Sequence, residues 1–397
     1  MFSLAVANPP LQRSLTLGYA AGNLADIEQI QPTGIKHDLD VLDPADTRVP
    51  LTYSWSLTLS HRLPSDTLLE VAYVGNTSRN QISPNGYNLN VVPEGAMLNL
   101  GPNDSTDPND YRPFQNYGLV HWRSHILNQH YNSLQVTAKR QTGRINYSVT
   151  YAFGKVLGMG GHYYGPGVDS FDRRGRSYGP LDTDRTNSLT VAYNILLPDP
   201  AKRNAFMRQI ANGWQISGIS EIQSGGPLET ANGGGAFNLS GTMANGQDIT
   251  EVLVTGTPDT PVRPFLTCDP RKGLDMSTQP GFAGRQYANP NCFAAPSPGQ
   301  NGMYQLPYLK TPAFMNHDVS LFKNFALSTT HENLKLQFRA SAFNFVNHPN
   351  AIFQGGDPGL LLNFVDGVLD QDSIQNFGRP IKKRGKRVIR FALKFMF

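Results

Sequence analysis

Polar and apolar residues alternate along several segments of the chain, a pattern typical of β-strands whose two faces differ in chemistry. The clearest segment is 145–153, whose odd positions are Ile, Tyr, Val, Tyr and Phe and whose even positions are Asn, Ser, Thr and Ala. A tilted strand of about nine residues spans a bilayer. Weaker segments bring the total to about ten predicted strands. They cover residues 11–19, 53–63, 67–75, 131–141, 145–154, 187–197, 213–224, 316–327, 334–345 and 387–397.

The connections between these strands alternate in length. Short or medium connections cover 64–66, 142–144, 198–212 and 328–333, and long ones cover about 20–52, 76–130, 155–186, 225–315 and 346–386. Outer-membrane barrels have short periplasmic turns and long extracellular loops. If the last strand ends in the periplasm, every short connection falls on that side, provided that residues 117–123 belong to a loop or a hairpin extension. The order of connections therefore predicts an all-β fold, an antiparallel transmembrane β-barrel or part of one.

Composition agrees with this prediction and narrows the classes of function. Charged residues make up 16% of the chain, whereas 38 glycines and 29 prolines favour strands joined by long irregular loops. The net charge is only +4 and the basic residues are scattered, except near the C-terminus, so we expect no nucleic-acid partner. No stretch approaches 18 apolar residues, which excludes a transmembrane helix. A soluble β-sandwich or propeller stays open as an alternative, although such folds have shorter and more even loops.

The chain ends on a strand with one strongly apolar face. Arg390 and Lys394 occupy the opposite face, which in a barrel points into the lumen. We expect the apolar face to contact lipid in the cell outer membrane and to act as the C-terminal signal that the barrel-assembly machinery recognises. A buried terminal strand of a soluble sheet is the alternative. The residues of this face are Ile389, Phe391, Leu393, Phe395 and Phe397.

Several segments resemble the Oar-like β-barrel region of TonB-dependent receptors, a family that carries a carboxypeptidase-regulatory-like domain at its N-terminus. Together the segments extend over nearly the whole chain, and none of them is a catalytic motif. They are Leu51–Leu57, Leu69–Asn76, Tyr131–Val136, Gly213–Gly218, Asp318–Phe325 and Gln337–Asn350.

The resemblance implies a transporter with a barrel of about 22 strands, an N-terminal plug and a short box that contacts the inner-membrane energy-coupling protein. This sequence has room for about ten strands and no plug, and its start lacks the basic region and the apolar length of a secretory signal. We therefore expect residues 1–397 to form a single unit, the C-terminal part of such a barrel. Its partners would be the missing N-terminal barrel half and plug, and it should not transport alone.

Two cysteines, Cys268 and Cys292, lie in the longest predicted loop. An exported protein meets an oxidising compartment, so a disulfide is expected, and closing a loop of this length contributes roughly 3 kcal/mol. Two unpaired loop cysteines are the alternative. Without paired histidines the two cysteines do not form a zinc site.

No other cluster predicts a metal, a cofactor or catalysis. The histidines within 121–130 have no helical pattern to align them, and the aspartates within 104–110 lack the spacing and the closing glutamate of a calcium loop. Gly233–Gly235 lacks the Lys-Ser/Thr of a phosphate loop. We expect no cofactor and no enzymatic activity.

A basic run precedes the last strand, on the predicted outer side. Such a run can bind the phosphates of lipopolysaccharide by the electrostatics that draw basic segments to anionic lipids, or it can simply be solvated. Its members are Lys382, Lys383, Arg384 and Lys386.

Three functional hypotheses follow. The first is the barrel segment of an energy-coupled importer whose unknown ligand is recognised by loops 76–130, 155–186 and 225–315. The second is a self-contained barrel that acts as a passive pore, adhesin or surface scaffold. The third is a soluble carbohydrate-binding β-protein.

Overall fold

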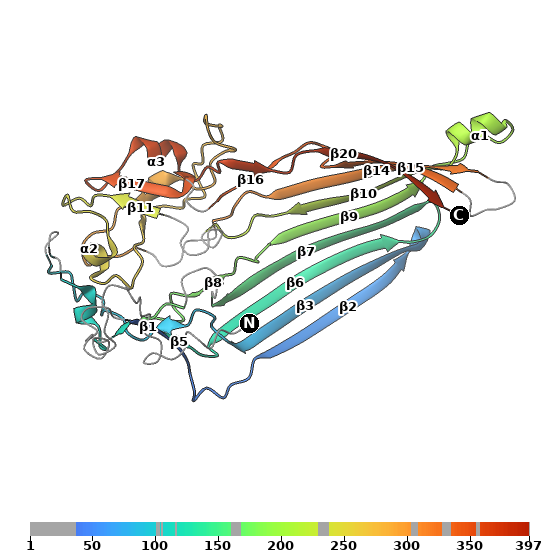
Figure 1. Cartoon of the computed structure of the whole chain (residues 1–397). Coiled ribbons are helices and arrows are strands. Elements are labelled where there is room, and N and C mark those ends of the chain that lie inside the picture. Colours follow the sequence, from blue (N-terminus) through green and yellow to red (C-terminus); the bar gives the residue numbers. More distant parts are fainter. Residues whose placement is uncertain are drawn as a thin grey trace, which may run out of the picture.

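A computed structural model of the chain describes residues 37–100, 104, 106–115, 117–159, 168–228, 238–302, 309–327, 335–354 and 358–396. Within these residues nine long strands form one antiparallel sheet, in which long strands that follow each other along the chain are paired (Figure 1). The short strand β8 (Tyr178–Pro180) pairs with the end of β7 beside this path. The nine strands are β2 (Leu51–Leu63), β3 (Thr67–Gln81), β6 (Leu127–Arg140), β7 (Ile145–Met159), β9 (Asn187–Leu196), β10 (Trp214–Gln223), β14 (Phe314–Ala326), β15 (Lys335–Phe343) and β20 (Val388–Met396).

These strands confirm nine of the predicted ones, although β3 and β7 extend six and five residues beyond the predicted ends at 75 and 154. The predicted strand 11–19 lies outside the described residues. The segment 117–123 forms β5 (Tyr117–Arg123), which pairs with β1 (His37–Leu42) and β4 (Tyr87–Asn88) in a separate sheet. It therefore does not interrupt the order of the long strands. The long connections gather at one end of the sheet, and the turn after β2 and the C-terminus lie at the other (Figure 1).

The register places apolar residues on one face of the sheet and polar residues on the other, because residues directly opposite each other on neighbouring strands share a face. One apolar row crosses seven strands: Leu59, Val71, Val136, Tyr151, Leu189, Ile222 and Met315. The adjacent row across the same strands is polar: Ser60, Glu70, Thr137, Thr150, Thr190, Glu221 and Asn316. The alternation read from the sequence is thus continuous across the sheet.

The apolar face of the sheet is exposed. Leu59, Phe391 and Leu393 are 69%, 71% and 70% exposed, and the ring of Phe391 stacks on Phe338 of the neighbouring strand. Aromatic rings also lie over glycines of this face: a Cβ at Gly75 would lie 2.5 Å from the Trp55 ring. An apolar surface of this extent is unfavourable in water, whereas contact with lipid acyl chains removes it from water.

The final strand keeps the predicted faces. Ile389, Phe391, Leu393 and Phe395 are paired with Ala342, Ala340, Phe338 and Leu336 on the apolar face. Arg390 and Lys394 are paired with Ser341 and Gln337 on the polar face. Phe397 lies outside the described residues.

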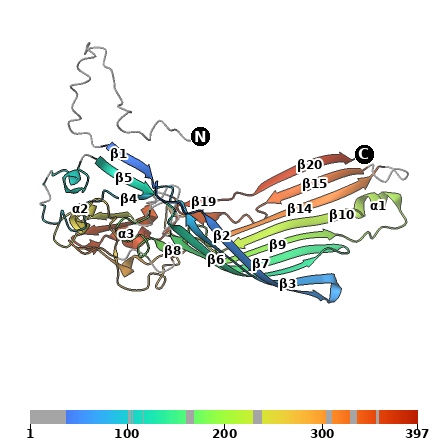
Figure 2. The same ribbon diagram turned by 90° about the horizontal axis from the view of Figure 1, so that it is seen from below.

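The long connections carry most of the remaining secondary structure, which we call the loop cap (Figures 1 and 2). Its helices are α2 (Glu251–Thr255) and α3 (Gln371–Asn376), with 3-10 turns at Pro108–Tyr111, Pro290–Cys292 and Pro358–Leu360. Besides β1, β4 and β5, its strands are β11 (Asn238–Gly241), β12 (Phe265–Leu266), β13 (Phe293–Ala294), β16 (Asn350–Ile352), β17 (Leu361–Val365), β18 (Val368–Leu369) and β19 (Lys382–Arg384). At the other end lie the 3-10 turn Pro64–Asp66 and helix α1 (Ala205–Ala211).

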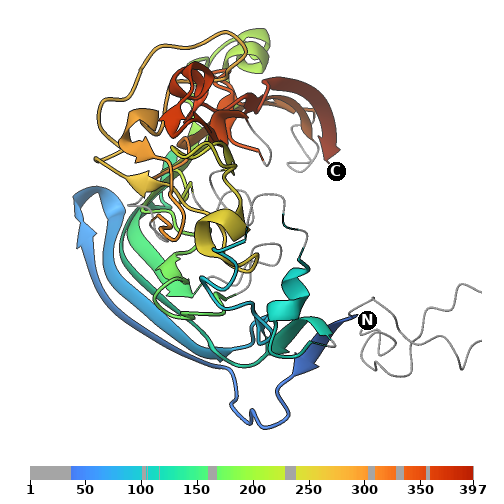
Figure 3. The same ribbon diagram turned by 90° about the vertical axis from the view of Figure 1, so that its left-hand side faces the viewer.

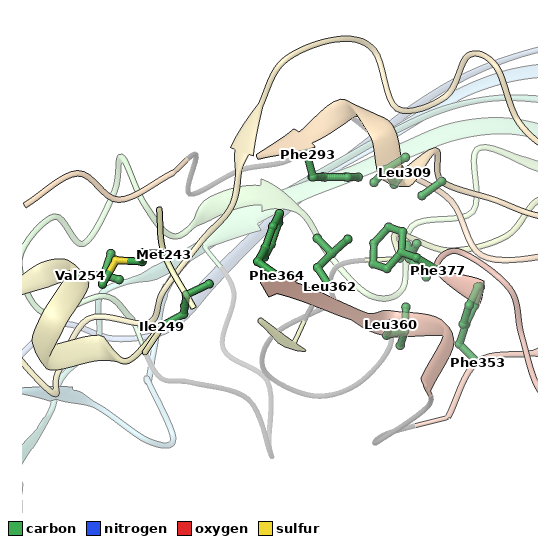
Figure 4. Close-up of a cluster of buried hydrophobic side chains, with 12 residues drawn as sticks. Met243, Ile249, Val254, Phe293, Leu309, Phe353, Leu360, Leu362, Phe364 and Phe377 are labelled. Atoms are coloured by element: carbon green, nitrogen blue, oxygen red, sulfur yellow. The ribbon is translucent and has the colours of Figure 1, made fainter. Parts of the chain in front are cut away.

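The larger hydrophobic core lies in the loop cap and not against the sheet (Figure 4). It is built from the connections between β10 and β14 and between β15 and β20, which lie apart in sequence. Its buried residues are Leu228, Met243, Ile249, Val254, Ala288, Phe293, Leu309, Phe353, Leu360, Leu362, Phe364 and Phe377. A smaller cluster of Leu127, Met159 and Val168 lies where β6 begins and β7 ends.

The sheet is curved and open (Figure 3). Its edge strands β2 and β20 each pair on one side only among the described residues. Within that same part of the chain, no helix has the length and the apolar character needed to cross a membrane.

A charged side chain introduced on the apolar face should destabilise the protein more than one introduced on the polar face. Val149 lies on the apolar face, in the middle of the part of β7 that pairs with β9 (residues 145–153), and Ala152 lies on the polar face of the same strand. Val149→Arg should destabilise the membrane-inserted protein by about 2 to 4 kcal/mol, the cost of arginine at the lipid midplane, whereas Ala152→Arg should cost far less. Urea unfolding in phospholipid vesicles measures both, and equal losses would contradict the assignment of faces.

Candidate ligand-recognition site

The three loops that the sequence predicts to recognise a ligand are joined to one another in the loop cap. Arg112 of the loop after β3 forms two hydrogen bonds with the carboxylate of Asp259 in the loop after β10, at 2.8 and 3.1 Å. Both side chains are buried, with 6% and 9% of their surface exposed. The same carboxylate accepts the backbone N–H of Val92 at 2.8 Å. This ion pair is therefore shielded from solvent, and both oxygens of the carboxylate accept hydrogen bonds.

Asn90 organises the loop around this ion pair. Its side chain is fully buried, donates to the carbonyl oxygens of Phe114, Tyr117 and Gly118, and accepts the backbone N–H of Phe114 at 2.7 Å. The carbonyl oxygen of Asn90 in turn accepts a hydrogen bond from Arg112. Because a buried amide that makes all these bonds has one orientation, the two halves of the loop after β3 are held together.

Glu94 connects all three loops. Its carboxylate accepts two hydrogen bonds from Arg176 of the loop after β7, at 2.6 and 3.0 Å, and one from the hydroxyl of Thr260 at 2.9 Å. A second contact between the first two loops places the guanidinium of Arg173 4.5 Å from the centre of the Tyr87 ring, a cation-π distance.

A fourth long loop, between β15 and β20, belongs to the same assembly. Arg379 is fully buried and donates to the Asp275 carboxylate and to the backbone carbonyls of Ser277 and Gln375. Gln286 donates to the carbonyl oxygen of Phe377 at 3.0 Å. The sequence did not indicate that this loop takes part, because neither arginine-acid pair has a local pattern: Arg112 and Asp259 are 147 residues apart.

The cap also contains the two cysteines. A disulfide joins Cys268 to Cys292, whose Cα atoms are 4.8 Å apart, and Cys292 is fully buried beside the core. The backbone N–H of Thr267 donates to the carbonyl oxygen of Cys292 at 2.8 Å, next to the pairing of β12 with β13. The covalent link and the small hairpin thus close the same stretch of loop.

Several ionisable groups of the cap have shifted pKa values, among them Asp275 and Lys310. Hydrogen bonds from the backbone N–H and hydroxyl of Ser277, together with the guanidinium of Arg379, lower the pKa of Asp275. Burial lowers the pKa of Lys310, whose ammonium donates to the hydroxyl of Thr186. Both groups are engaged in contacts between segments of the cap, so the shifts have a structural cause.

The other candidate residues are dispersed. His121, His125 and His130 contact Asp40, Asp46 and Thr77 respectively, and do not face one another. Asp104 accepts from Thr106, and Asp107 caps the Pro108–Tyr111 turn. Within the described part of the chain, no three His, Cys, Asp or Glu side chains are grouped to hold a metal.

Aromatic residues of the loop after β7 could stack on a sugar or a chelate, and in the sequence these are Tyr163, Tyr164, Phe171 and Tyr178. Two of them are engaged by the protein itself. Phe171 lies under the guanidinium of Arg176 at 5.7 Å, and Tyr178 packs against the cluster of Leu127 and Met159. Tyr163, Tyr164 and Gly233–Gly235 lie outside the described residues.

The basic run before the last strand is exposed. Lys382 to Arg384 form β19, whose backbone pairs with β16, and Lys386 follows directly. The four cations therefore lie at the cap end of the sheet, close to the start of β20.

An antiparallel sheet with one lipid-compatible face, joined by alternately short and long connections, defines an outer-membrane barrel wall. The chain belongs to the family described as outer membrane beta barrel domain, whose sequence profile matches residues 5–389. The location is thus the outer membrane, and the alternative of a soluble carbohydrate-binding protein is wrong. Among curated proteins, none matches the chain.

Solved structures with detectable similarity to the chain include an iron transporter, an import receptor and a complex with a pyocin. The FrpB iron transporter from Neisseria meningitidis is 9% identical with a TM-score of 0.40, over 91% of this chain and 33% of that one. The ferric-catecholate import receptor Fiu from E. coli K12 is 8% identical with a TM-score of 0.37, over 88% and 28%. The FpvAI–pyocin S2 complex is 8% identical with a TM-score of 0.34, over 88% of this chain and 27% of that one. The chain spans about a third of the length of these structures or less.

The buried ion pair predicts how the cap responds to mutation. Arg112→Ala leaves the Asp259 carboxylate buried without its cation, so the cap should lose about 3 to 5 kcal/mol of local stability. Arg271→Ala removes a cation that is half exposed and pairs with Asp269 two residues away, and it should cost at most about 1 kcal/mol. Hydrogen exchange of the cap amides measures both, and equal protection in the two variants would argue against a shared cap network.

Proposed function

We propose that the chain forms part of the wall and the outer cap of an energy-coupled importer, and that the loop cap recognises the ligand on the cell surface. The observation that carries this proposal is the joining of four long loops into one packed unit with its own hydrophobic core. A passive pore needs no such unit, whereas a receptor needs a surface whose side chains hold fixed positions for a ligand.

The proposal also concerns the rest of the barrel. Edge strands with unpaired N–H and C=O groups are not stable in hydrocarbon, so β2 and β20 each need a further partner strand. The resemblance to the Oar-like barrel of TonB-dependent receptors supports additional strands and a plug from the same receptor as those partners. On this proposal the nine-stranded sheet is the C-terminal part of the barrel and does not transport alone.

A tagged chain tests this proposal. Gly246 lies in an exposed turn of the cap where an added Cβ would have no heavy atom within 4 Å, so we choose this turn for the tag. Protein purified from outer membranes through that tag should contain further barrel strands and a plug, and should give no steady conductance in planar bilayers. If the chain alone resists detergent as a closed barrel and conducts ions, the self-contained pore is correct and the importer proposal fails.

We further propose that the apolar face ending at Phe395 and Phe397 is read by the barrel-assembly machinery, and that the basic run contacts lipopolysaccharide. The support for the second contact is geometric and electrostatic. Four exposed cations lie together where the loop cap meets the start of β20, which is the end assigned to the outer leaflet.

Neutralising the basic run tests the lipopolysaccharide contact. The variant Lys382→Gln, Lys383→Gln, Arg384→Gln, Lys386→Gln should copurify with several-fold less lipopolysaccharide, measured by mass spectrometry of the bound lipid. The matched control removes cations at the opposite end of the sheet, Lys202→Gln and Arg203→Gln, and should leave the bound amount unchanged. Equal amounts in all three proteins would remove the proposed contact.

A further inference from the structure

The medium connection between β9 and β10 has an apolar surface that no part of the sheet covers. It contains helix α1, in which Phe206, Met207 and Ile210 are 70%, 48% and 51% exposed. At about 100° per residue, these three side chains fall on one side of the helix and Arg208 falls on the other. Lys202 and Arg203, both exposed, precede the helix.

This connection is fixed at the rim of the apolar face. Asn212 and Ala201 close it with two hydrogen bonds of 2.9 and 3.0 Å, and Asp199 accepts the N–H of Gly213 at 2.9 Å. The indole N–H of Trp214, which lies on the apolar face, donates to the carbonyl oxygen of Ile210 at 2.8 Å. Helix α1 is therefore held in a defined position beside the lipid-facing surface.

A lysine on the apolar face completes the attachment. Lys323 is paired with Trp214 and Phe338, and only 2% of its surface is exposed. Its ammonium donates to the carbonyl oxygen of Asn212 and lies 5.6 Å from the Trp214 ring and 4.8 Å from the Phe325 ring. The charge is thus turned away from the hydrocarbon and toward the connection that carries α1.

We propose that residues 199–212 form an interfacial anchor that lies in the phospholipid headgroups of the leaflet opposite the loop cap. The apolar side of α1 would enter the acyl region, and the cations Lys202, Arg203 and Arg208 would contact lipid phosphates. Two observations support this occupant: the apolar side of α1 is continuous with the lipid-facing surface at Trp214, and its flanking charges are complementary to phosphate. The inference rests on the proposed orientation, in which the short connections face the periplasm.

Nitroxide accessibility tests the anchor on the chain purified from outer membranes together with the strands that complete its barrel. Single cysteines introduced by Phe206→Cys, Arg208→Cys and Leu393→Cys can be labelled selectively because the two native cysteines are bonded to each other. In vesicles of phosphatidylethanolamine and phosphatidylglycerol, oxygen collisions should exceed those of a nickel chelate at 206 and 393. At 208, collisions with the nickel chelate should exceed those with oxygen. The ratio of oxygen collisions to nickel-chelate collisions should differ several-fold between 206 and 208.

The outcomes separate the anchor from the barrel itself. If 393 is in lipid while 206 is as accessible to nickel as 208, the anchor is overturned and the barrel stands. If 393 is also exposed to nickel, the lipid-facing sheet fails and the anchor fails with it. In the variant Lys202→Gln, Arg203→Gln, the label at 206 should move outward, and an unchanged depth would overturn the electrostatic part of the proposal.

Discussion

The structure depends on one constraint: a backbone that crosses hydrocarbon must satisfy its N–H and C=O groups within the sheet, because lipid offers no hydrogen-bond partner. Pairing each long strand with its neighbours in sequence meets this demand through short hairpins on one side. It also sets the register, and the register decides which side chains face lipid. The apolar and polar rows that run unbroken across seven strands follow from this pairing.

Because lipid covers the sheet, the hydrophobic effect acts elsewhere in the molecule. Buried apolar side chains gather in the loop cap, where Phe293, Leu362 and Phe377 pack as in a small soluble domain. The charged groups divide in the same way. Arg390 and Lys394 lie on the polar face of the sheet, while Arg112 and Arg379 are buried in the cap with carboxylate partners. The lysine on the apolar face, Lys323, is tolerated because a backbone carbonyl at the rim receives its ammonium.

The strands could be predicted from sequence because a two-faced strand repeats every second residue, so segment 145–153 is recognisable alone. The cap could not be predicted, since irregular loops have no period and their partners are remote in the chain. Glu94 and Thr260, for instance, are 166 residues apart. Alternation also failed to indicate the role of Lys323. Its ammonium binds a carbonyl oxygen of the connection between β9 and β10, and no periodic pattern in the sequence predicts that contact.

The joining of the four long loops has a consequence for how such a protein can diversify. In a barrel whose loops are independent, each loop can change length or sequence without affecting the others. Here Glu94 connects three loops by hydrogen bonds and Arg379 connects a fourth loop to them. A change in one loop therefore alters the contacts that support the neighbouring loops. Substitutions should therefore be tolerated mainly at exposed turns, such as that around Gly246, while a change at a buried arginine–acid pair requires compensating changes in more than one loop.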